Sequence, residues 1–165
     1  MIRSARNEDV GQIRDIYNHY IENTVITFEE LPVSPEDMRN RFNEVTGLYP
    51  WLVYDDGGKV IGYAYAAGWK SRSAYRFSVE STVYVREDSL GKGIGAALYR
   101  ELLDRLKAAG VHAVLAGISL PNEKSRKLHE KFGFVKVAHL PQVGYKFDQW
   151  IDVGYWELIF DRPSA

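Results

Sequence analysis

Residues 78–98 read SVESTVYVREDSLGKGIGAAL, and the change of pattern inside this stretch decides the interpretation of the rest of the chain. The β-branched run from Ser78 to Val85 predicts a strand, and a polar bend follows it. Gly91, Gly93 and Gly95 then lead directly into an Ala- and Leu-rich helix. Glycines before a helix leave backbone N–H groups accessible, and the helix N-terminus adds partial positive charge. The loop is therefore expected to hold a phosphate group.

The composition of the 165 residues is that of a globular protein. The length predicts one domain, residues 1–165, and the hydrophobic share of 45% with 13% aromatic residues argues against disorder. A net charge of −1 leaves no electrostatic footprint for nucleic acid or an anionic membrane. The chain has no cysteine, which excludes disulfides, thiolate metal sites and a cysteine nucleophile. The polar start MIRSARNEDV is no signal peptide and no apolar run reaches membrane length, so we expect a cytoplasmic protein without a metal.

The remaining pattern predicts helices and strands in a mixed order. Asn7 is expected to cap a first helix, and Ser34 with Pro35 begins a second. The other predicted helices are 93–109 and 122–132, and the predicted strands are 51–54, 60–68, 78–85, 113–117, 134–140 and 153–160. This order indicates an α+β fold, a mixed and mostly antiparallel sheet with helices packed on it.

Two familiar phosphate-binding motifs do not explain the glycines. The spacing Gly91-x-Gly93-x-x-Ala96 satisfies a loose dinucleotide fingerprint, but residues 86–90 separate the strand from the glycines and no acid follows at the ribose position. A Walker A loop needs a Lys-Ser or Lys-Thr pair after its glycines, and Lys92 is followed by glycine. A tight strand-to-helix turn without any ligand stays open as an alternative at this point.

Three further segments resemble the GCN5-related N-acetyltransferase (GNAT) family. Leu90-Gly91-Lys92-Gly93-Ile94-Gly95 is similar to the signature before the family's long helix, and PNEKSRKLHEKFGF at 121–134 to its later helix and strand. GYKFDQWIDVGYW at 144–156 resembles the subgroup of phosphinothricin, methionine sulfoximine and methionine sulfone acetyltransferases. The resemblance implies six to seven strands flanked by about four helices, acetyl-CoA as co-substrate and a homodimer. The implied reaction is direct acetyl transfer to the α-amine of a small amino acid analogue.

One position departs from the family signature. Leu90 stands where the family has Arg or Gln, a side chain associated with the cofactor's pyrophosphate region. We expect its loss to weaken cofactor binding modestly, because the glycine N–H groups and the helix N-terminus provide most of the anchoring. Lys92 is either a compensating positive charge or a solvated loop lysine.

Glu80 and His129 are the candidate catalytic residues. Glu80 is an acid inside an otherwise apolar and hydroxylic strand, where burial would raise its pKa and suit it to act as a general base. A solvated glutamate on an edge strand is the alternative. His129 follows Asn122 on its predicted helix, at the position where many relatives carry a tyrosine near the departing sulfur. Its imidazole would donate to the thiolate or help move the substrate proton.

The resemblance also implies binding residues for both substrates. The backbone of Val83, Tyr84 and Val85 is expected to pair with the pantetheine arm, and the Val83 N–H to serve as oxyanion donor. The other cofactor-binding candidates are Gly91, Lys92, Gly93, Ile94, Gly95, Ala96, Asn122 and Ser125. The substrate-binding candidates are Arg72, Ser73, Ala74, Tyr75, Arg76, Phe28 and Glu29, because arginine suits an anionic amino acid. Lys146 and Trp150 are expected to reach the site, from this chain or a partner subunit.

Two other functions remain open from the sequence. One is acetylation of protein N-termini, lysines or polyamines, although the basic loop around Arg72 and Arg76 favours an anionic small molecule. The other is a CoA-binding module that senses without turnover, against which the presence of Glu80 and His129 argues. The physiological substrate, and whether herbicide or antibiotic resistance is the role, are not decided by the sequence.

Overall fold

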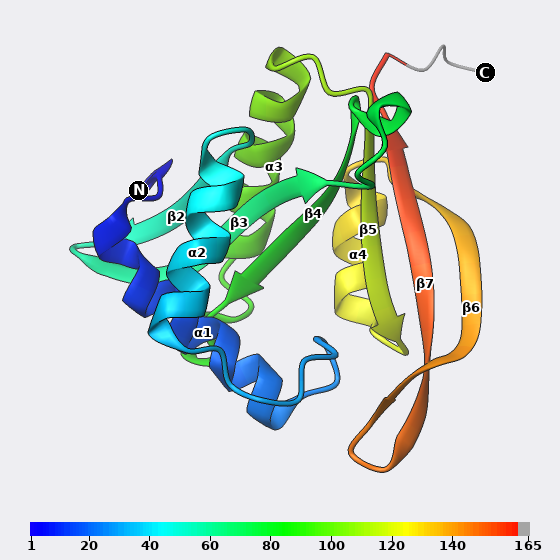
Figure 1. The fold of residues 1–165 in the computed structure, drawn as a ribbon, viewed down its shortest axis with the longest axis horizontal. Coiled ribbons are helices and arrows are strands. Elements are labelled where there is room, and N and C mark those ends of the chain that lie inside the picture. The colour runs from blue at the N-terminus through cyan, green and yellow to red at the C-terminus, as the bar shows by residue number, and fades with distance from the viewer. Residues whose placement is uncertain (162–165) are drawn as a thin grey trace.

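A computed structural model describes residues 1–161 of the chain, in which one twisted sheet runs through the whole molecule (Figure 1). The strand order is β1-β2-β3-β4-β5-β7-β6. The strands are β1 (Ile2–Ser4), β2 (Trp51–Asp56), β3 (Lys59–Gly68), β4 (Ser78–Val85), β5 (Ala113–Leu120), β6 (Val135–Lys146) and β7 (Gln149–Ile159). Every neighbouring pair is antiparallel except β4 and β5. The predicted α+β class with a mostly antiparallel sheet is confirmed.

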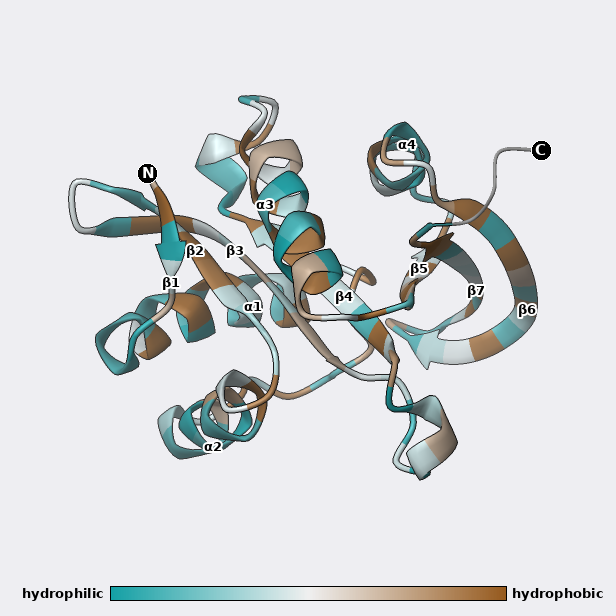
Figure 2. Ribbon diagram, turned by 90° about the horizontal axis from the view of Figure 1, so that it is seen from above, coloured by the Kyte–Doolittle hydropathy of each residue, from teal (hydrophilic) through white to brown (hydrophobic). Residues whose placement is uncertain are grey.

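Helices cover both faces of the sheet, and each face has its own apolar core (Figure 2). On one face lie α1 (Val10–Asn23) and α2 (Pro35–Thr46), whose buried side chains pack with Trp51 and Tyr63 of the sheet. On the other face lie α3 (Ile94–Ala108) and α4 (Glu123–Lys131). Leu98, Leu102 and other apolar residues of α3 form a second core there with β4, β5 and β7. Among the described residues, no helix is both long and apolar enough to cross a membrane.

The parallel pair β4–β5 opens the sheet in its middle. Its register covers only Ser78–Glu80 against Ala113–Leu115, and beyond Glu80 the two strands separate. Beyond this point β4 remains paired with β3, and β5 remains paired with β7. The gap between residues 81–85 and 116–120 is therefore a break inside a sheet that is continuous at its other end.

The structure corrects three details of the predicted elements. Residues 2–4 form a short strand that the sequence pattern is too brief to indicate. Asn7 is not the cap of the first helix, because a 3-10 turn begins there and the Asp9 carboxylate accepts from the Arg6 backbone N–H instead. The last two strands are longer than predicted and meet at a turn where Phe147 and Asp148 have positive φ angles of 52° and 57°. Pro141 is tolerated because β6 is an edge strand with a register shift there.

Candidate active site

Two cavities meet where β4 and β5 separate. The first, which we call the Glu80 cavity, has a volume of about 300 Å³ and includes Glu80, Gly117, His129 and Tyr155 in its lining. The second, the glycine-loop groove, has about 590 Å³ and runs along the start of α3. Residues that line both are Ile26, Val83, Tyr84 and Ser125. A ligand in the groove can therefore present one end to a ligand in the cavity.

The glycine loop has the geometry that its sequence predicts. Gly91 and Gly93 both have φ angles of +77°, a region that only glycine enters without strain, and Gly93 is the N-cap of α3. A Cβ at either glycine would meet no atom within 4 Å, so the space in front of the loop is open. Leu90 lines the groove, whereas Lys92 donates to the Asp88 carbonyl at 3.1 Å and does not line it. The loop and the helix N-terminus thus form an open, backbone-lined site for an anion.

The inner edge of β4 presents backbone groups to the gap. Arg86 donates its N–H to the Ile61 carbonyl on β3, and by the alternation of a strand the backbone groups of Tyr84 also point to β3. Those of Val83 and Val85 therefore point the opposite way, toward the gap. The Tyr20 hydroxyl donates to the Val85 carbonyl at 2.5 Å. The N–H groups of Val83 and Val85 are then directed at any extended chain lying between the strands.

The start of α4 forms the opposite wall of the groove. The Asn122 side chain caps the helix, accepting from the Ser125 N–H at 3.1 Å. Asn122 and Ser125 both line the groove, and Ser125 continues into the Glu80 cavity. The structure thus brings most of the predicted cofactor-binding residues together: Val83, Tyr84, Val85, Gly91, Gly93, Ile94, Gly95, Ala96, Asn122 and Ser125.

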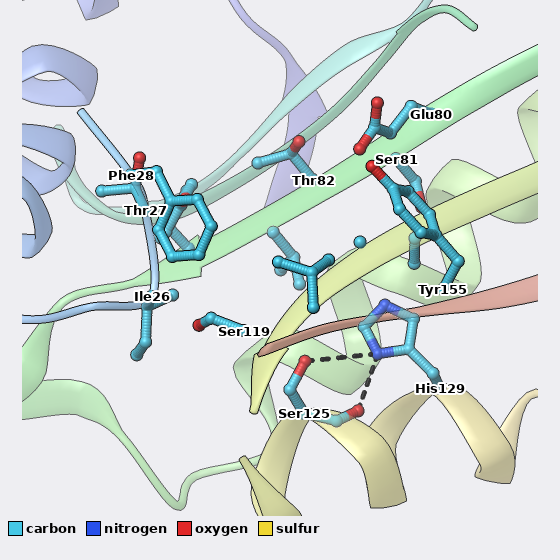
Figure 3. Close-up of a pocket in the computed structure, with 15 residues that line it drawn as sticks. Ile26, Thr27, Phe28, Glu80, Ser81, Thr82, Ser119, Ser125, His129 and Tyr155 are labelled. Carbon is cyan, nitrogen blue, oxygen red and sulfur yellow. Dashed lines mark hydrogen bonds between the residues drawn. The ribbon is translucent and has the colours of Figure 1, made fainter. Parts of the chain in front are cut away.

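Glu80 lies half-buried in the cavity beside an aromatic ring (Figure 3). Burial raises its pKa, and the positive charge of Lys70 opposes this shift. Beneath the carboxylate lies Gly117, where an added Cβ would approach Glu80 Oε1 to 3.3 Å and the Tyr155 ring to 3.2 Å. The absence of a side chain at Gly117 therefore leaves room for Glu80 and Tyr155 to share the same space. The arrangement favours a carboxylate that accepts a proton more readily than an exposed glutamate does.

His129 is buried, with 4% of its surface exposed, and both of its ring nitrogens have partners inside the protein. Nδ1 lies 2.7 Å from the Ser125 carbonyl oxygen, which can only accept, so Nδ1 carries the hydrogen and donates. Nε2 then accepts from the Tyr99 hydroxyl at 2.9 Å, and Tyr99 in turn is bonded to the Ser81 hydroxyl. Burial lowers the pKa of His129. Burial therefore favours the neutral imidazole, and its two hydrogen bonds define one tautomer.

Glu80 and His129 approach the cavity from opposite faces of the sheet. Ser81 bonds to Tyr99 of α3, and Glu80, its neighbour in the strand, points to the other face. Both side chains line one cavity only because the gap between β4 and β5 passes through the sheet (Figure 3). The spacing of residues in the sequence cannot show that Glu80 and His129 line one cavity, because this depends on where β4 and β5 separate.

Several predicted substrate residues lie elsewhere. Phe28 lines the Glu80 cavity, but Glu29 does not, and it forms an ion pair with Arg41 at 2.6 Å. The segment Arg72–Arg76 is exposed in the connection between β3 and β4, outside the cavity lining. Lys146 is buried and bonded to backbone, and Trp150 is exposed; neither lines the cavity. The assignments of Glu29 and the Arg72–Arg76 segment stay predictions.

Several residues of the site were not predicted from the sequence, among them Tyr155, Gly117, Ser81 and Tyr99. Tyr99 carries a faint signal, since it is a hydroxyl on the apolar face of the long helix. Gly117 is the last residue of the predicted strand 113–117, and its need for an empty side-chain position arises from Tyr155 on the neighbouring strand. Residues 1–161 contain no group of three or more histidines or acids arranged to hold a metal ion.

Comparison with known proteins agrees with this geometry. The model of the acetyltransferase (GNAT) domain family matches residues 2–154. The chain is 41% identical over 99% of its length to a phosphinothricin N-acetyltransferase from Streptomyces viridochromogenes, of which it covers 89%. It is 37% identical, over 99% of its length and 96% of the relative's, to an L-methionine sulfoximine/L-methionine sulfone acetyltransferase from Salmonella typhimurium. The chain therefore belongs to the GNAT family of acetyltransferases.

Solved structures extend the likeness to the whole fold. A putative acetyltransferase from Salmonella typhimurium, solved with its cofactor acetyl-CoA, superposes with a TM-score of 0.96 at 36% identity, covering 100% of this chain and 96% of that one. A phosphinothricin acetyltransferase from Sinorhizobium meliloti in complex with acetyl-CoA gives a TM-score of 0.93 at 38% identity, covering 96% and 87%.

Proposed function

We propose that this protein transfers the acetyl group of acetyl-CoA to the α-amine of a small amino acid analogue such as phosphinothricin, methionine sulfoximine or methionine sulfone. The observation that carries the proposal is the junction of the two cavities at Val83 and Ser125, with a half-buried carboxylate on one side and a glycine loop on the other. The names of the relatives support this substrate class.

Acetyl-CoA fits the groove by its chemistry. The pyrophosphate would lie on the N–H groups of residues 91–96 and the N-terminus of α3. The pantetheine arm would extend along Val83 and Val85, whose backbone groups face the gap. When bound, acetyl-CoA supplies the activated acetyl group as a thioester. Since the chain has no cysteine to carry an acetyl group, and the two cavities share four lining residues, direct transfer between two bound substrates is the simplest route.

Glu80 is the general base of this mechanism. An α-ammonium group must lose a proton before it can attack, and a carboxylate with a raised pKa in the acceptor's cavity can take it directly or through one water molecule. The Val83 N–H, directed into the gap, is suited to donate to the carbonyl oxygen that gains charge. Both groups come from the same strand, so its rigidity sets the distance between them.

His129 acts from beneath the cavity. Its Nδ1–H is donated to Ser125, so it orients the residue that lies at the junction of the two cavities. To donate this hydrogen to a departing thiolate, Nδ1 would first have to break its hydrogen bond to the Ser125 carbonyl oxygen. The fixed tautomer and the Tyr99–Ser81 hydroxyls give the histidine one orientation in either case.

The test is release of free thiol from acetyl-CoA by the purified protein, measured with methionine sulfone, methionine sulfoximine, phosphinothricin, glutamate, a polyamine and a lysine peptide. We expect saturable turnover with at least one of the first three. Turnover only with the polyamine or peptide would replace the substrate class. Acetyl-CoA binding with no turnover on any amine would favour a sensing module.

We further infer a homodimer that acts in the cytoplasm, on the resemblance to the phosphinothricin acetyltransferase subgroup. Light scattering during size-exclusion chromatography would give twice the monomer mass of 18.9 kDa for a dimer. A resistance role is tested by expressing the chain in phosphinothricin-sensitive bacteria, where growth on the compound is the expected result.

A further inference from the structure

The hairpin of β6 and β7 extends past the end of β5 as a long arm (Figure 1). The last residue of β6, Lys146, is buried. Lys146 is 1% exposed, although lysine is almost never fully buried. Its ammonium group donates to the Ile21 carbonyl at 2.7 Å and to the Thr27 carbonyl at 2.8 Å. Both acceptors are backbone oxygens, more than a hundred residues away in the sequence.

The two carbonyls belong to consecutive segments, the end of α1 and the loop that follows it. Ile21 is in the last turn of α1, where carbonyl oxygens lack partners within the helix. Thr27 is in the following loop, where Thr27 and Phe28 line the Glu80 cavity and not the glycine-loop groove; we call these two residues the wall. One ammonium group therefore ties the wall to the end of the helix before it.

A second contact joins the arm to the wall. Phe28 covers Gly144 so closely that a Cβ at Gly144 would lie less than 3.0 Å from three atoms of the ring. From the other side, the Thr27 hydroxyl is hydrogen-bonded to Tyr17 of α1 at 2.9 Å. The wall is thus fixed between α1 and the arm, while Gly144 and Lys146 are themselves outside the cavity lining.

We propose that Lys146 is a positioning residue of the acceptor pocket, which holds the wall at the distance from Glu80 that the amino acid requires. This inference rests on the proposed function. Without the ammonium group, two buried carbonyl oxygens lose the donor that Lys146 provides. The wall then becomes mobile on the acceptor side, whereas the glycine loop, which the arm does not contact through this lysine, keeps its shape.

Lys146→Met tests the proposal, because methionine fills a similar volume without a donor. We expect the KM for the amino acid to rise about 10-fold, as the loss of a buried donor predicts, with kcat changed by less than about 3-fold and the affinity for acetyl-CoA by less than about 3-fold. Amide hydrogen exchange in residues 22–30 should become faster. The matched control is Val143→Ala on the same arm, where the side chain is 58% exposed. In this variant neither the KM for the amino acid nor the exchange in residues 22–30 should change.

A folded Lys146→Met protein with unchanged KM and unchanged exchange would overturn the proposal. If that variant does not fold, Gly144→Ala tests the same wall by displacing Phe28, and an unchanged KM for the amino acid would again overturn it. If the unmodified protein acetylates no amino acid, the proposed function fails by itself. Hydrogen exchange then still decides whether Lys146 holds the wall, so the two failures are distinguishable.

Discussion

The glycine-loop groove and the Glu80 cavity lie side by side, but they are built differently. Most of the groove comes from one continuous stretch, residues 83–96, which holds the inner edge of β4, two glycines at φ +77° and the N-terminus of α3; α1, the loop after it and α4 complete the lining. The Glu80 cavity is made of side chains from β4, β5, β7, α4 and the loop after α1. Backbone geometry tolerates changes of side chain, whereas the cavity depends on contacts between distant segments. Substitutions in the groove should therefore change mainly the affinity for acetyl-CoA, whereas substitutions in the cavity should change turnover or the KM for the amino acid.

The largest expected effect is in the cavity. Glu80→Gln should lower kcat by about 100-fold or more, because a general base contributes at least that much, while acetyl-CoA binding stays unchanged. Stopped-flow turnover and calorimetric binding measure the two quantities. The raised pKa means that ionised Glu80 costs stability above that pKa, so Glu80→Gln should unfold no more easily than the unmodified protein at pH 8. Full activity in the variant would remove Glu80 from the mechanism.

The next effect belongs to the groove. Gly93→Ala places a side chain at φ +77°, where a residue other than glycine loses about 1–2 kcal/mol, and the cap of α3 must distort or remain strained. We expect acetyl-CoA affinity to fall about 10-fold, with the KM for the amino acid almost unchanged. Gly57→Ala, at φ +62° in the turn between β2 and β3, is the matched control with similar strain far from the groove. An equal loss of acetyl-CoA affinity in both variants would contradict the assignment.

Tyr99→Phe tests the hydrogen bonds that link Ser81, Tyr99 and His129. The change deletes the hydroxyl between Ser81 and His129 and leaves the buried Nε2 without a donor, at a cost of about 1–3 kcal/mol in the free energy of unfolding. We expect kcat to fall about 5-fold because His129 loses its fixed orientation, a smaller effect than at Glu80. Urea denaturation and steady-state kinetics measure both. A variant with normal stability and a normal rate would show that the hydroxyl chain has no role.

The smallest effect is a shift in pH dependence. The rate should fall at low pH as Glu80 becomes protonated, along a limb set by its raised pKa. Lys70 lowers that pKa, so Lys70→Met should move the acidic limb of kcat/KM to higher pH. Lys92→Met, a change in the groove, should leave the limb in place. A limb that moves to lower pH in Lys70→Met would mean that another group controls it.

The two regions also differ in how well the sequence predicts them. Residues 78–85 form a strand with the predicted bounds, and the long helix begins at Ile94, one residue from the prediction, because β-branched alternation and glycines before a helix are local signals. The strands after residue 134 were predicted too short, since Pro141 reads as a break unless the strand is known to be an edge. In the site, Tyr155 and Gly117 could not be linked, because they are neighbours only across the pairing of β5 and β7.

The sequence by itself determined the α+β class, the glycine loop before α3, the strand that carries Glu80 and the likeness to the GNAT family. These follow from residues close together in the chain, whose spacing sets strand alternation, helix caps and positive φ angles. Only the tertiary structure decided that β4 and β5 part beyond Glu80, that both ring nitrogens of His129 are hydrogen-bonded inside the protein, and that Lys146 is buried against the wall. Those features depend on which distant segments pack together, and a buried group takes its chemistry from those neighbours.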